Sequence, residues 1–372
     1  MTQNKAIKTL TIKTLGLSFL GGLLLFGLLS SGCQNFRSQK SHQEGRALPL
    51  PPKGFKPSPI RLLIDLENSE QAQFSPDGER LLFMSRQLSQ HHQAQVYEYN
   101  IAQKRKRRIT FQDGEILYPN YHPSKDLILY ASTTDEIKEN PKYIQRALQR
   151  LQNSEEEVKE PSASLPWEDQ PFEIYSSLRN GEEIRRWTRS PGYDGEPRFH
   201  PLQDKIVFSS LRSGSLQIYR QVGPQGRPQL VWGAPELHQT EPRFSPSDES
   251  LIWVQLSQDL KTSQIVRQSS PQQDPEPLTS GSFIHRQPEF SPDGEKLIFS
   301  SNRGDGETFQ IYTLNIETGC LKRLTYTNSN QFYPRWSPDQ KQVVFHSDES
   351  GKNRIYMMEY RAPEDCEESD ES

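Results

Sequence analysis

Phe290-Ser291-Pro292-Asp293-Gly294 is the stretch that decides the fold, because the chain repeats it. The other clear copy is Phe74-Ser75-Pro76-Asp77-Gly78, and looser copies are Phe244-Ser245-Pro246-Ser247-Asp248 and Trp336-Ser337-Pro338-Asp339-Gln340. Two further copies carry histidine in place of serine, Tyr121-His122-Pro123 and Phe199-His200-Pro201. The shared prolines stand at 76, 123, 201, 246, 292 and 338, with gaps of 47, 78, 45, 46 and 46 residues. A period in the mid-forties is typical of a four-stranded β-propeller blade.

Each copy continues with the same pattern. An apolar run comes next, as at 206–208 or 343–345, followed by a third run such as 310–314 and a fourth such as 321–325. Short runs of β-branched and aromatic residues separated by turn residues predict antiparallel strands. In the turns, proline presets φ, while Gly78 and Gly294 accept a positive φ. The Asp-Gly pairs are therefore interpreted as turn residues, since a calcium loop would need alternating ligands and a terminal glutamate.

The two ends of the repeat region complement each other. Residues 60–64 look like a fourth strand without the first three, and the last copy, ending at 355–358, looks like three strands without a fourth. Joined, they complete one blade and leave no open edges. The sequence thus predicts an all-β, six-bladed β-propeller over 60–361, with four-stranded antiparallel blades and a ring closed by the N-terminal strand.

The long gap of 78 residues indicates an insertion at about 136–170. Within it, Ile144, Ala147, Leu148 and Leu151 share one face at helical spacing, which predicts a short amphipathic helix. Two interpretations stay open: the helix caps the flank of the second blade, or it docks a partner.

The N-terminus has the features of a targeting signal. A basic and polar start leads into an apolar run over 15–29, which has the length of a signal-peptide core and is short for a membrane span. Ser30-Ser31-Gly32-Cys33 follows, and 1–32 resembles a bacterial lipoprotein signal with Cys33 as the lipidated first residue of the mature chain. Ser30 departs from the aliphatic residue usual there, so an uncleaved anchor or an ordinary signal peptide remains an alternative. Gln34, in place of an inner-membrane aspartate, favours the periplasmic side of the outer membrane.

Composition limits the remaining segments and the classes of partner. Residues 33–59 are proline-rich and predict an extended tether, and 362–372 are acidic and predict a disordered tail. The net charge of −4 gives no electrostatic reason to bind nucleic acid. The basic run 104–108 is interpreted as a solvated outer strand in preference to a lipid or nucleic-acid patch. Cys320 and Cys366 could pair, although two cysteines imply no disulfide framework.

The repeat with its following runs 299–303 and 310–312 resembles the TolB-like propeller repeat, over residues 60–360. TolB is a periplasmic protein with an α/β domain before its propeller, and it contacts the lipoprotein Pal through the propeller. Only a tether is expected before residue 60, so the resemblance implies a docking propeller and leaves a direct TolB role in doubt. Envelope proteins, among them a Pal-like lipoprotein, are the implied partners of what we expect to be a monomer.

The first strand of each blade borders the channel, so its residues are the candidate site. Directly before the proline of each first strand, or its equivalent Ala72, stand Gln71, Tyr118, Glu196, Glu241, Gln287 and Tyr333, and nearby lie Glu70, His285, Arg286 and Phe332. Aromatics, carboxylates and an arginine around one opening suit recognition of a protein segment. The equally favoured alternative is that these residues only solvate a wet channel.

Catalytic motifs do not occur in the sequence. It holds no Gly-x-Ser-x-Gly, His-Glu-x-x-His, P-loop or Rossmann fingerprint, and the propeller uses nearly all residues. His122 and His200 are interpreted as turn residues, and neither a metal nor a cofactor is expected. We therefore predict a non-catalytic, lipid-anchored, protein-binding scaffold. The alternative is an enzyme or a small-ligand or metal-binding propeller that uses the channel, with His285 and Glu241 as the residues to test.

Overall fold

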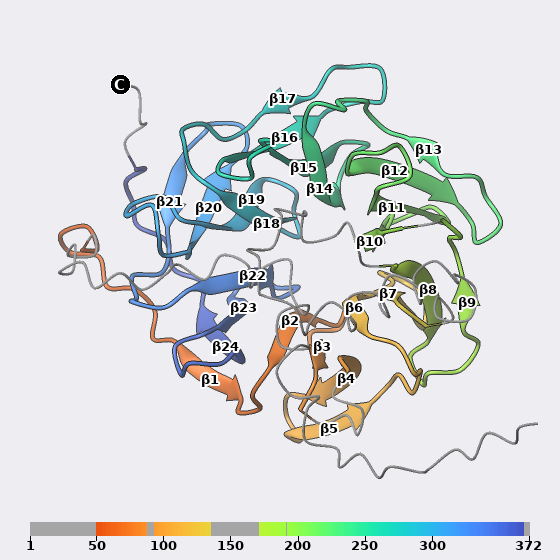
Figure 1. Ribbon diagram of the computed structural model, residues 1–372. Helices are drawn as coiled ribbons and strands as arrows, with labels where there is room; N and C mark the ends of the chain where they lie inside the picture. Colours follow the sequence, from red (N-terminus) through yellow and green to blue (C-terminus); the bar gives the residue numbers. More distant parts are fainter. Residues whose placement is uncertain (1–49, 88–92, 135–170, 191, 368–372) are drawn as a thin grey trace, which may run out of the picture.

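Each copy of the repeat folds as one blade of a ring. The computed structural model describes residues 50–87, 93–134, 171–190 and 192–367. Over these residues the chain forms 24 strands in six four-stranded sheets arranged around a central channel (Figure 1). The predicted all-β, six-bladed propeller is confirmed. The signal segment, Cys33 and the helix expected at 141–151 lie outside the described residues.

The first three blades follow the chain from the inner strand outward. Blade 1 contains β2 (Ser69–Phe74), β3 (Arg80–Ser85), β4 (Gln95–Asn100) and β5 (Arg105–Arg108). Blade 2 contains β6 (Ile116–Tyr121), β7 (Leu127–Ser132), β8 (Glu173–Leu178) and β9 (Arg185–Arg186). Blade 3 contains β10 (Asp194–Phe199), β11 (Lys205–Ser210), β12 (Gln217–Val222) and β13 (Gln229–Leu230).

The second half of the ring has the same order. Blade 4 contains β14 (His238–Phe244), β15 (Leu251–Leu256), β16 (Ser263–Gln268) and β17 (Glu276–Pro277). Blade 5 contains β18 (His285–Phe290), β19 (Lys296–Ser301), β20 (Gln310–Asn315) and β21 (Leu321–Arg323). Blade 6 contains β22 (Gln331–Trp336), β23 (Gln342–Ser347), β24 (Arg354–Glu359) and, as its outer strand, β1 (Arg61–Ile64).

The ring is closed by β1, as the sequence predicts. This strand pairs antiparallel with β24, where Arg61 lies opposite Met357 and Leu62 opposite Tyr356. The next residues bind the same blade, since Arg354 contacts Asp65 at 3.0 Å and Glu67 at 3.2 Å. One blade therefore joins the two ends of the repeat region.

The repeated turn has a hydrogen-bonded structure that explains its residues. Ser291 Oγ donates to Asp293 Oδ1 at 2.5 Å and accepts from Lys296 N at 2.9 Å, while Gly294 has a φ of 78°. In blades 2 and 3, histidine replaces the serine as acceptor: His122 Nδ1 accepts from Lys125 N at 3.0 Å and His200 Nδ1 from Gln203 N at 3.1 Å. The interpretation of these histidines as turn residues is confirmed.

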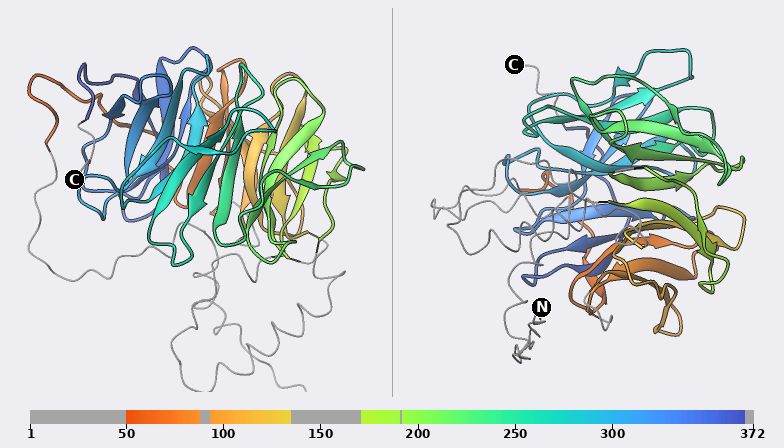
Figure 2. Two further views of the ribbon diagram at one scale, coloured as in Figure 1. Left: turned by 90° about the horizontal axis from the view of Figure 1, so that it is seen from above. Right: turned by 45° about the vertical axis from the view of Figure 1, so that its right-hand side comes forward.

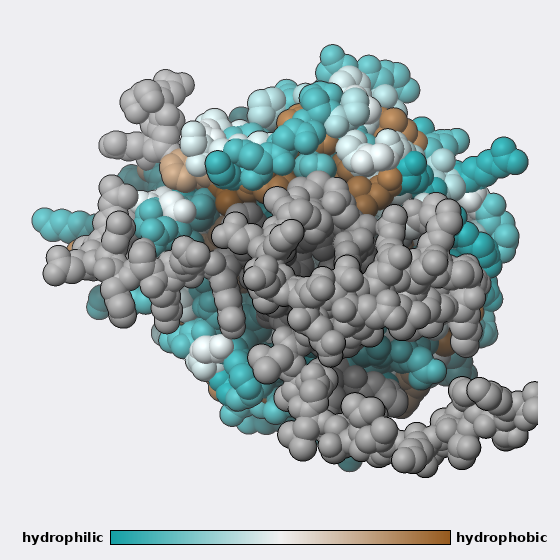
Figure 3. Space-filling model, in the orientation of Figure 1, coloured by the Kyte–Doolittle hydropathy of each residue, from teal (hydrophilic) through white to brown (hydrophobic). Residues whose placement is uncertain are grey.

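The hydrophobic core lies between neighbouring blades. The second strands are buried on both faces, as Leu81, Leu82, Phe83 and Met84 of β3 show. One cluster joins Leu82 and Val96 of blade 1 to Ile128 and Tyr130 of blade 2. In side view the blades stand against one another around the ring (Figure 2). On the visible face the rim is mainly hydrophilic, with hydrophobic areas nearer the centre (Figure 3).

The outer parts of the ring refine two expectations. The basic run forms β5, the outer strand of blade 1, and three of its four residues are exposed. Within the predicted tail that starts at Ala362, Cys366 is disulfide-bonded to Cys320 and Glu367 N donates to Leu321 O at 2.7 Å. Residues 368–372 lie outside the described part. No helix in the described segments has the length and apolar character that spanning a membrane requires.

Candidate functional site

A β-bulge interrupts the inner strand of every blade at the same place. In β10 the pairing with β11 shifts between Gly195 and Arg198, so Glu196 and Pro197 together stand against one residue. The bulged residues adopt positive φ values of 53–57°, and they are Gln71, Tyr118, Glu196, Glu241, Gln287 and Tyr333. That conformation costs a non-glycine residue roughly 1–2 kcal/mol, so surrounding contacts must hold it. These six are the residues that the sequence places at the channel.

The bulged side chains bind the neighbouring blade. Gln71 Oε1 accepts from Tyr118 N at 2.7 Å, and Glu196 Oε2 accepts from Glu241 N at 2.7 Å. Glu241 accepts in turn from Gln287 N, and Gln287 Oε1 accepts from Tyr333 N at 3.2 Å. Each bond joins one blade to the next, so we name this set the channel latch. It explains why the strained backbone persists.

At the two junctions where the bulged residue is a tyrosine, other groups also form hydrogen bonds between the blades. Between blades 6 and 1, His346 Nδ1 accepts from Gln71 N at 3.4 Å. Burial lowers the pKa of His346 to about 4, which keeps this nitrogen free to accept at neutral pH. Between blades 2 and 3, Asn120 Nδ2 donates to Pro197 O at 2.9 Å.

Two carboxylates of the channel latch are buried. Glu241 forms an ion pair with Arg286 at 2.8 Å. Among the described residues no cation pairs with Glu196, whose Oε2 accepts from Ser209 Oγ at 2.6 Å and Thr240 Oγ1 at 2.5 Å. Burial, and then the charge of Glu241, raises the pKa of Glu196. The hydrogen bonds and the ion pair of these two side chains join neighbouring blades.

The other predicted residues gather in the same region. Glu70 accepts from Asn353 Nδ2 at 2.8 Å, and His285 packs edge-on against Phe299 with ring centroids 5.6 Å apart. Burial lowers the pKa of His285 to about 4. Of the ten predicted residues, Gln71 and Phe332 are partly exposed and the other eight are buried. Most of the ten are therefore buried, and a partner-binding role for them stays a prediction.

A hydrophobic cluster with several aromatic members lies at the end of the ring where the inner strands begin. Its buried members include Tyr118, Tyr193 and Tyr333, and the partly exposed Leu211, Leu260 and Phe332 pack against the cluster. We call these six residues the mouth cluster. Burial, and then the charge of Glu196, raises the pKa of Tyr193. Sequence reasoning missed Tyr193, Leu211 and Leu260 because they lie in loops rather than in the repeat's strands.

Sequence reasoning also missed a second layer of channel residues, two positions after each bulge. At this place the six blades carry Gln73, Asn120, Arg198, Arg243, Glu289 and Arg335. Glu289 Oε2 binds Arg243 Nε at 3.0 Å and Arg335 Nε at 3.2 Å. The repeated Pro-Arg pairs at 197–198, 242–243 and 334–335 were the available signal.

The two residues named as the test of an alternative channel-based function have other partners. Glu241 binds Arg286, and His285 lies against Phe299. Within the part of the chain that the structure describes, no three His, Cys, Asp or Glu residues gather in a way that could hold a metal ion.

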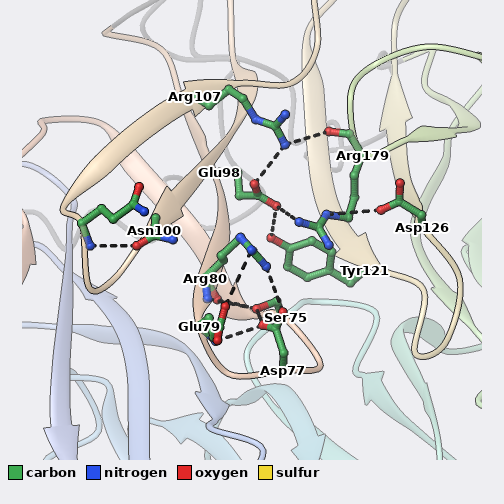
Figure 4. Close-up of polar contacts among 11 residues, drawn as sticks. Ser75, Asp77, Glu79, Arg80, Glu98, Asn100, Arg107, Tyr121, Asp126 and Arg179 are labelled. Atoms are coloured by element: carbon green, nitrogen blue, oxygen red, sulfur yellow. Dashed lines mark hydrogen bonds and ion pairs between the residues drawn. The ribbon is translucent and has the colours of Figure 1, made fainter.

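A separate ion network joins blades 1 and 2 away from the channel (Figure 4). Glu98 Oε1 accepts from Tyr121 OH at 2.9 Å and contacts Arg179 at 3.1 Å, while its Oε2 accepts from Arg107 at 3.0 Å. Burial, and then the charge of Glu98, raises the pKa of Tyr121. The network satisfies a buried carboxylate and reinforces a blade junction.

Glu173 occupies a place that glutamine takes in other blades. At the start of the third strand, Gln95, Gln217 and Gln310 each donate Nε2 to carbonyls of the loop that leads to the next blade. Glu173 Oε1 accepts from Ser190 N at 2.5 Å and lies 3.3 Å from the guanidinium of Arg186, but its buried Oε2 accepts no hydrogen bond among the described residues. Burial, and then the charge of Asp194, raises the pKa of Glu173 to about 7. A protonated Glu173 would imitate the glutamine.

Glu173→Gln should stabilise the ring at pH 8 and change little at pH 5. The folded pKa of about 7 lies above the ordinary value of 4.5, so this group's stabilising contribution is present at low pH and is lost as pH rises through 7. The shift corresponds to up to about 3 kcal/mol. Urea unfolding at both pH values measures it, with Glu183→Gln, an exposed neighbour, as control. Equal midpoints of Glu173→Gln and wild type at pH 8 would contradict this account.

Comparison with known proteins gives a family and a fold. The family model described as "TolB beta propeller domain" matches residues 163–305 and 240–365, together more than half of the chain. The Tol-Pal system protein TolB of Bordetella pertussis is 52% identical over 44 residues, which make up 12% of this chain and 10% of that protein. The chain thus matches about a tenth of the length of this relative.

Solved structures show the same architecture. One that carries the name TolB, from Agrobacterium tumefaciens, has a TM-score of 0.55 at 16% identity and covers 79% of this chain and 91% of that chain. An oligogalacturonate lyase in complex with manganese has a TM-score of 0.52 at 14% identity, with 82% and 94% covered. At such identities the likeness concerns the fold alone.

Proposed function

We propose, from the premise that this chain belongs to the TolB beta propeller domain family, that it is a non-catalytic protein of the bacterial cell envelope whose ring binds another protein. The mouth cluster carries this proposal. Its Leu211, Leu260 and Phe332 are all partly exposed and pack against a buried hydrophobic cluster that includes the three tyrosines. Apolar and aromatic groups on a well-packed base are what the centres of protein interfaces use.

The rigidity of the ring supports a binding role. The channel latch joins neighbouring blades, β1 closes the ring, and Cys320–Cys366 ties the C-terminal segment to blade 5. A preformed surface loses little conformational entropy when a partner binds, so a larger share of the contact energy goes into affinity.

Attachment at the membrane completes the proposal. We infer that Cys33 carries the lipid and that 33–59 spans the distance from the outer membrane to the ring on its periplasmic side. The two or three acyl chains of a bacterial lipoprotein bind a membrane firmly, whereas one chain binds marginally. The partner is an envelope protein, with a Pal-like lipoprotein as the first to test because the matching relative is a Tol-Pal system protein.

In-cell crosslinking of the full chain, followed by affinity purification, tests the binding role. We expect an envelope protein to be recovered with the wild type and lost with the double variant Leu211→Asp, Leu260→Asp. These leucines lie in loops after β11 and β15, so the strands keep their own side chains. Cys33→Ala should move the protein from the membrane fraction to the soluble fraction.

Leu202→Asp is the matched control, because Leu202 is 88% exposed in the turn at the opposite end of β10. This variant should keep the partner. Thermal unfolding of all variants shows whether the ring is intact. Recovery of the same partner with the double variant, or loss with Leu202→Asp alone, would place the interface elsewhere and refute the mouth cluster as the binding surface.

A further inference from the structure

Three arginines extend into the channel from equivalent positions of blades 3, 4 and 6. Each guanidinium is held by the bulge that precedes it, because its Nη1 donates to the carbonyl of the preceding proline. The distances are 3.1 Å from Arg198 to Pro197, 2.7 Å from Arg243 to Pro242 and 2.7 Å from Arg335 to Pro334. The three guanidinium groups thus share one anchor at the same register of their strands.

The charges in this layer do not balance. Glu289 of blade 5 lies between blades 4 and 6 and binds Arg243 and Arg335 through one oxygen. Arg198 of blade 3 lies between Asn120 and Arg243, so neither neighbour in its layer supplies a carboxylate. The channel carboxylates Glu196 and Glu241 bind hydroxyl groups and Arg286 instead.

Some hydrogen-bond donors in this layer also have no acceptor among the described residues. Among the residues that the structure describes, the buried Arg198 Nε and Arg335 Nη2 have no hydrogen-bond acceptor. Burial, and then the charges of Arg243 and Arg335, holds the pKa of Arg198 well below its ordinary value. Burial lowers the pKa of Arg335 to about 10 against the attraction of Glu289. A buried cation is costly unless it is paired and hydrogen-bonded.

We propose that Arg198, Arg243 and Arg335 form an anion-binding site inside the channel, which takes a carboxylate or phosphate group. The planar fork of a guanidinium matches the oxygens of both groups, and charge-assisted bonds of this kind are stronger than neutral ones. The ligand's oxygens fill the free positions on Arg198 and Arg335, and its charge adds to that of Glu289. The site lies below the mouth cluster, and its existence does not depend on the proposed partner.

Glu289 gives the test a direction that a purely structural role would not produce. Titration calorimetry of the full chain, at low ionic strength and without phosphate buffer, uses inorganic phosphate and acetate as separate probes. We expect Arg198→Gln and Arg335→Gln to weaken binding about tenfold or more, and Glu289→Gln to strengthen it about tenfold because it removes the competing carboxylate. The control is Arg185→Gln, an exposed arginine of β9, which should leave binding unchanged.

If phosphate binds more tightly than acetate, the site is supported and its ligand carries a phosphate group. If acetate binds more tightly than phosphate, the site is supported and its ligand carries a carboxylate group. The proposal is overturned if Glu289→Gln binds neither probe, or if the arginine variants bind as the wild type does. Glu289→Gln decides the matter even where an arginine variant fails to fold. Partner recovery in the crosslinking experiment is a separate readout, so failure of one proposal does not imply failure of the other.

Discussion

A chain that lacks residues 1–66 will lose much of its stability, because the ring then has no closing strand. The deletion removes the ladder between β1 and β24 and the ion pair of Asp65 with Arg354. It also removes the buried side chains of Ile64 and Leu66 from the junction of blades 6 and 1. Losing two such aliphatic side chains costs about 2–5 kcal/mol each. Urea unfolding followed by tryptophan fluorescence should show a clearly lower midpoint.

The matched control starts at residue 60 and keeps β1, so it should unfold near the full-length midpoint. A synthetic peptide of residues 56–68, added to the shorter chain, should restore part of the lost stability by pairing with the exposed edge of β24. Without the peptide that edge is free to pair with other chains, and we expect concentration-dependent association. Equal urea midpoints of the two truncated chains would show that β1 does not contribute to the stability of the ring.

The second large effect is expected at the buried pair Glu241 and Arg286. Glu241→Ala removes the partner of Arg286 at 2.8 Å and the acceptor for Gln287 N in the channel latch. Breaking a buried ion pair by deleting one member typically costs 3–5 kcal/mol, since a charge is left in a medium of low dielectric constant. Urea unfolding at pH 7 gives the value. The same variant should also loosen the junction of blades 4 and 5, measured by faster hydrogen exchange there.

A double-mutant cycle separates the pair from its surroundings. Glu241→Gln together with Arg286→Met should cost less than the sum of the two single variants, because replacing both partners leaves no isolated charge. The pair Glu359 and Arg361, at 2.6 Å but exposed, is the control and should contribute no more than about 1 kcal/mol. Strict additivity at Glu241 and Arg286 would contradict a role of the ion pair in stability.

The two proposals assign different tasks to the two levels of the channel. The mouth cluster offers apolar and aromatic surface suited to a protein partner. The arginine layer beneath it has cationic donors suited to a small anion or an acidic group. The channel latch between them consists of hydrogen bonds between blades, so substitutions at Glu196 or Glu241 are expected to change the stability of the ring.

The sequence by itself determined the fold, because each blade is encoded locally. Gly78 and Gly294 take the positive φ that the turn needs, and residues 60–64 pair with the last blade as their position indicates. These features depend on spacing and turn chemistry within about 46 residues, which a single chain displays directly. The same reasoning located the six bulged residues of the channel, since each precedes the proline of an inner strand or its equivalent Ala72.

Only the tertiary structure decided what those residues do. Glu196 and Glu241 bind donors on the next blade, 45 and 46 residues away, and nothing in the local pattern tells whether a side chain faces the channel or its neighbour. Likewise, the neighbours of Arg198 in its layer are Asn120 and Arg243, neither of which is a carboxylate, and Cys366 is bonded to Cys320, 46 residues earlier in the chain. Charge balance and side-chain direction are properties of the closed ring, because closure places residues from different repeats within hydrogen-bond distance.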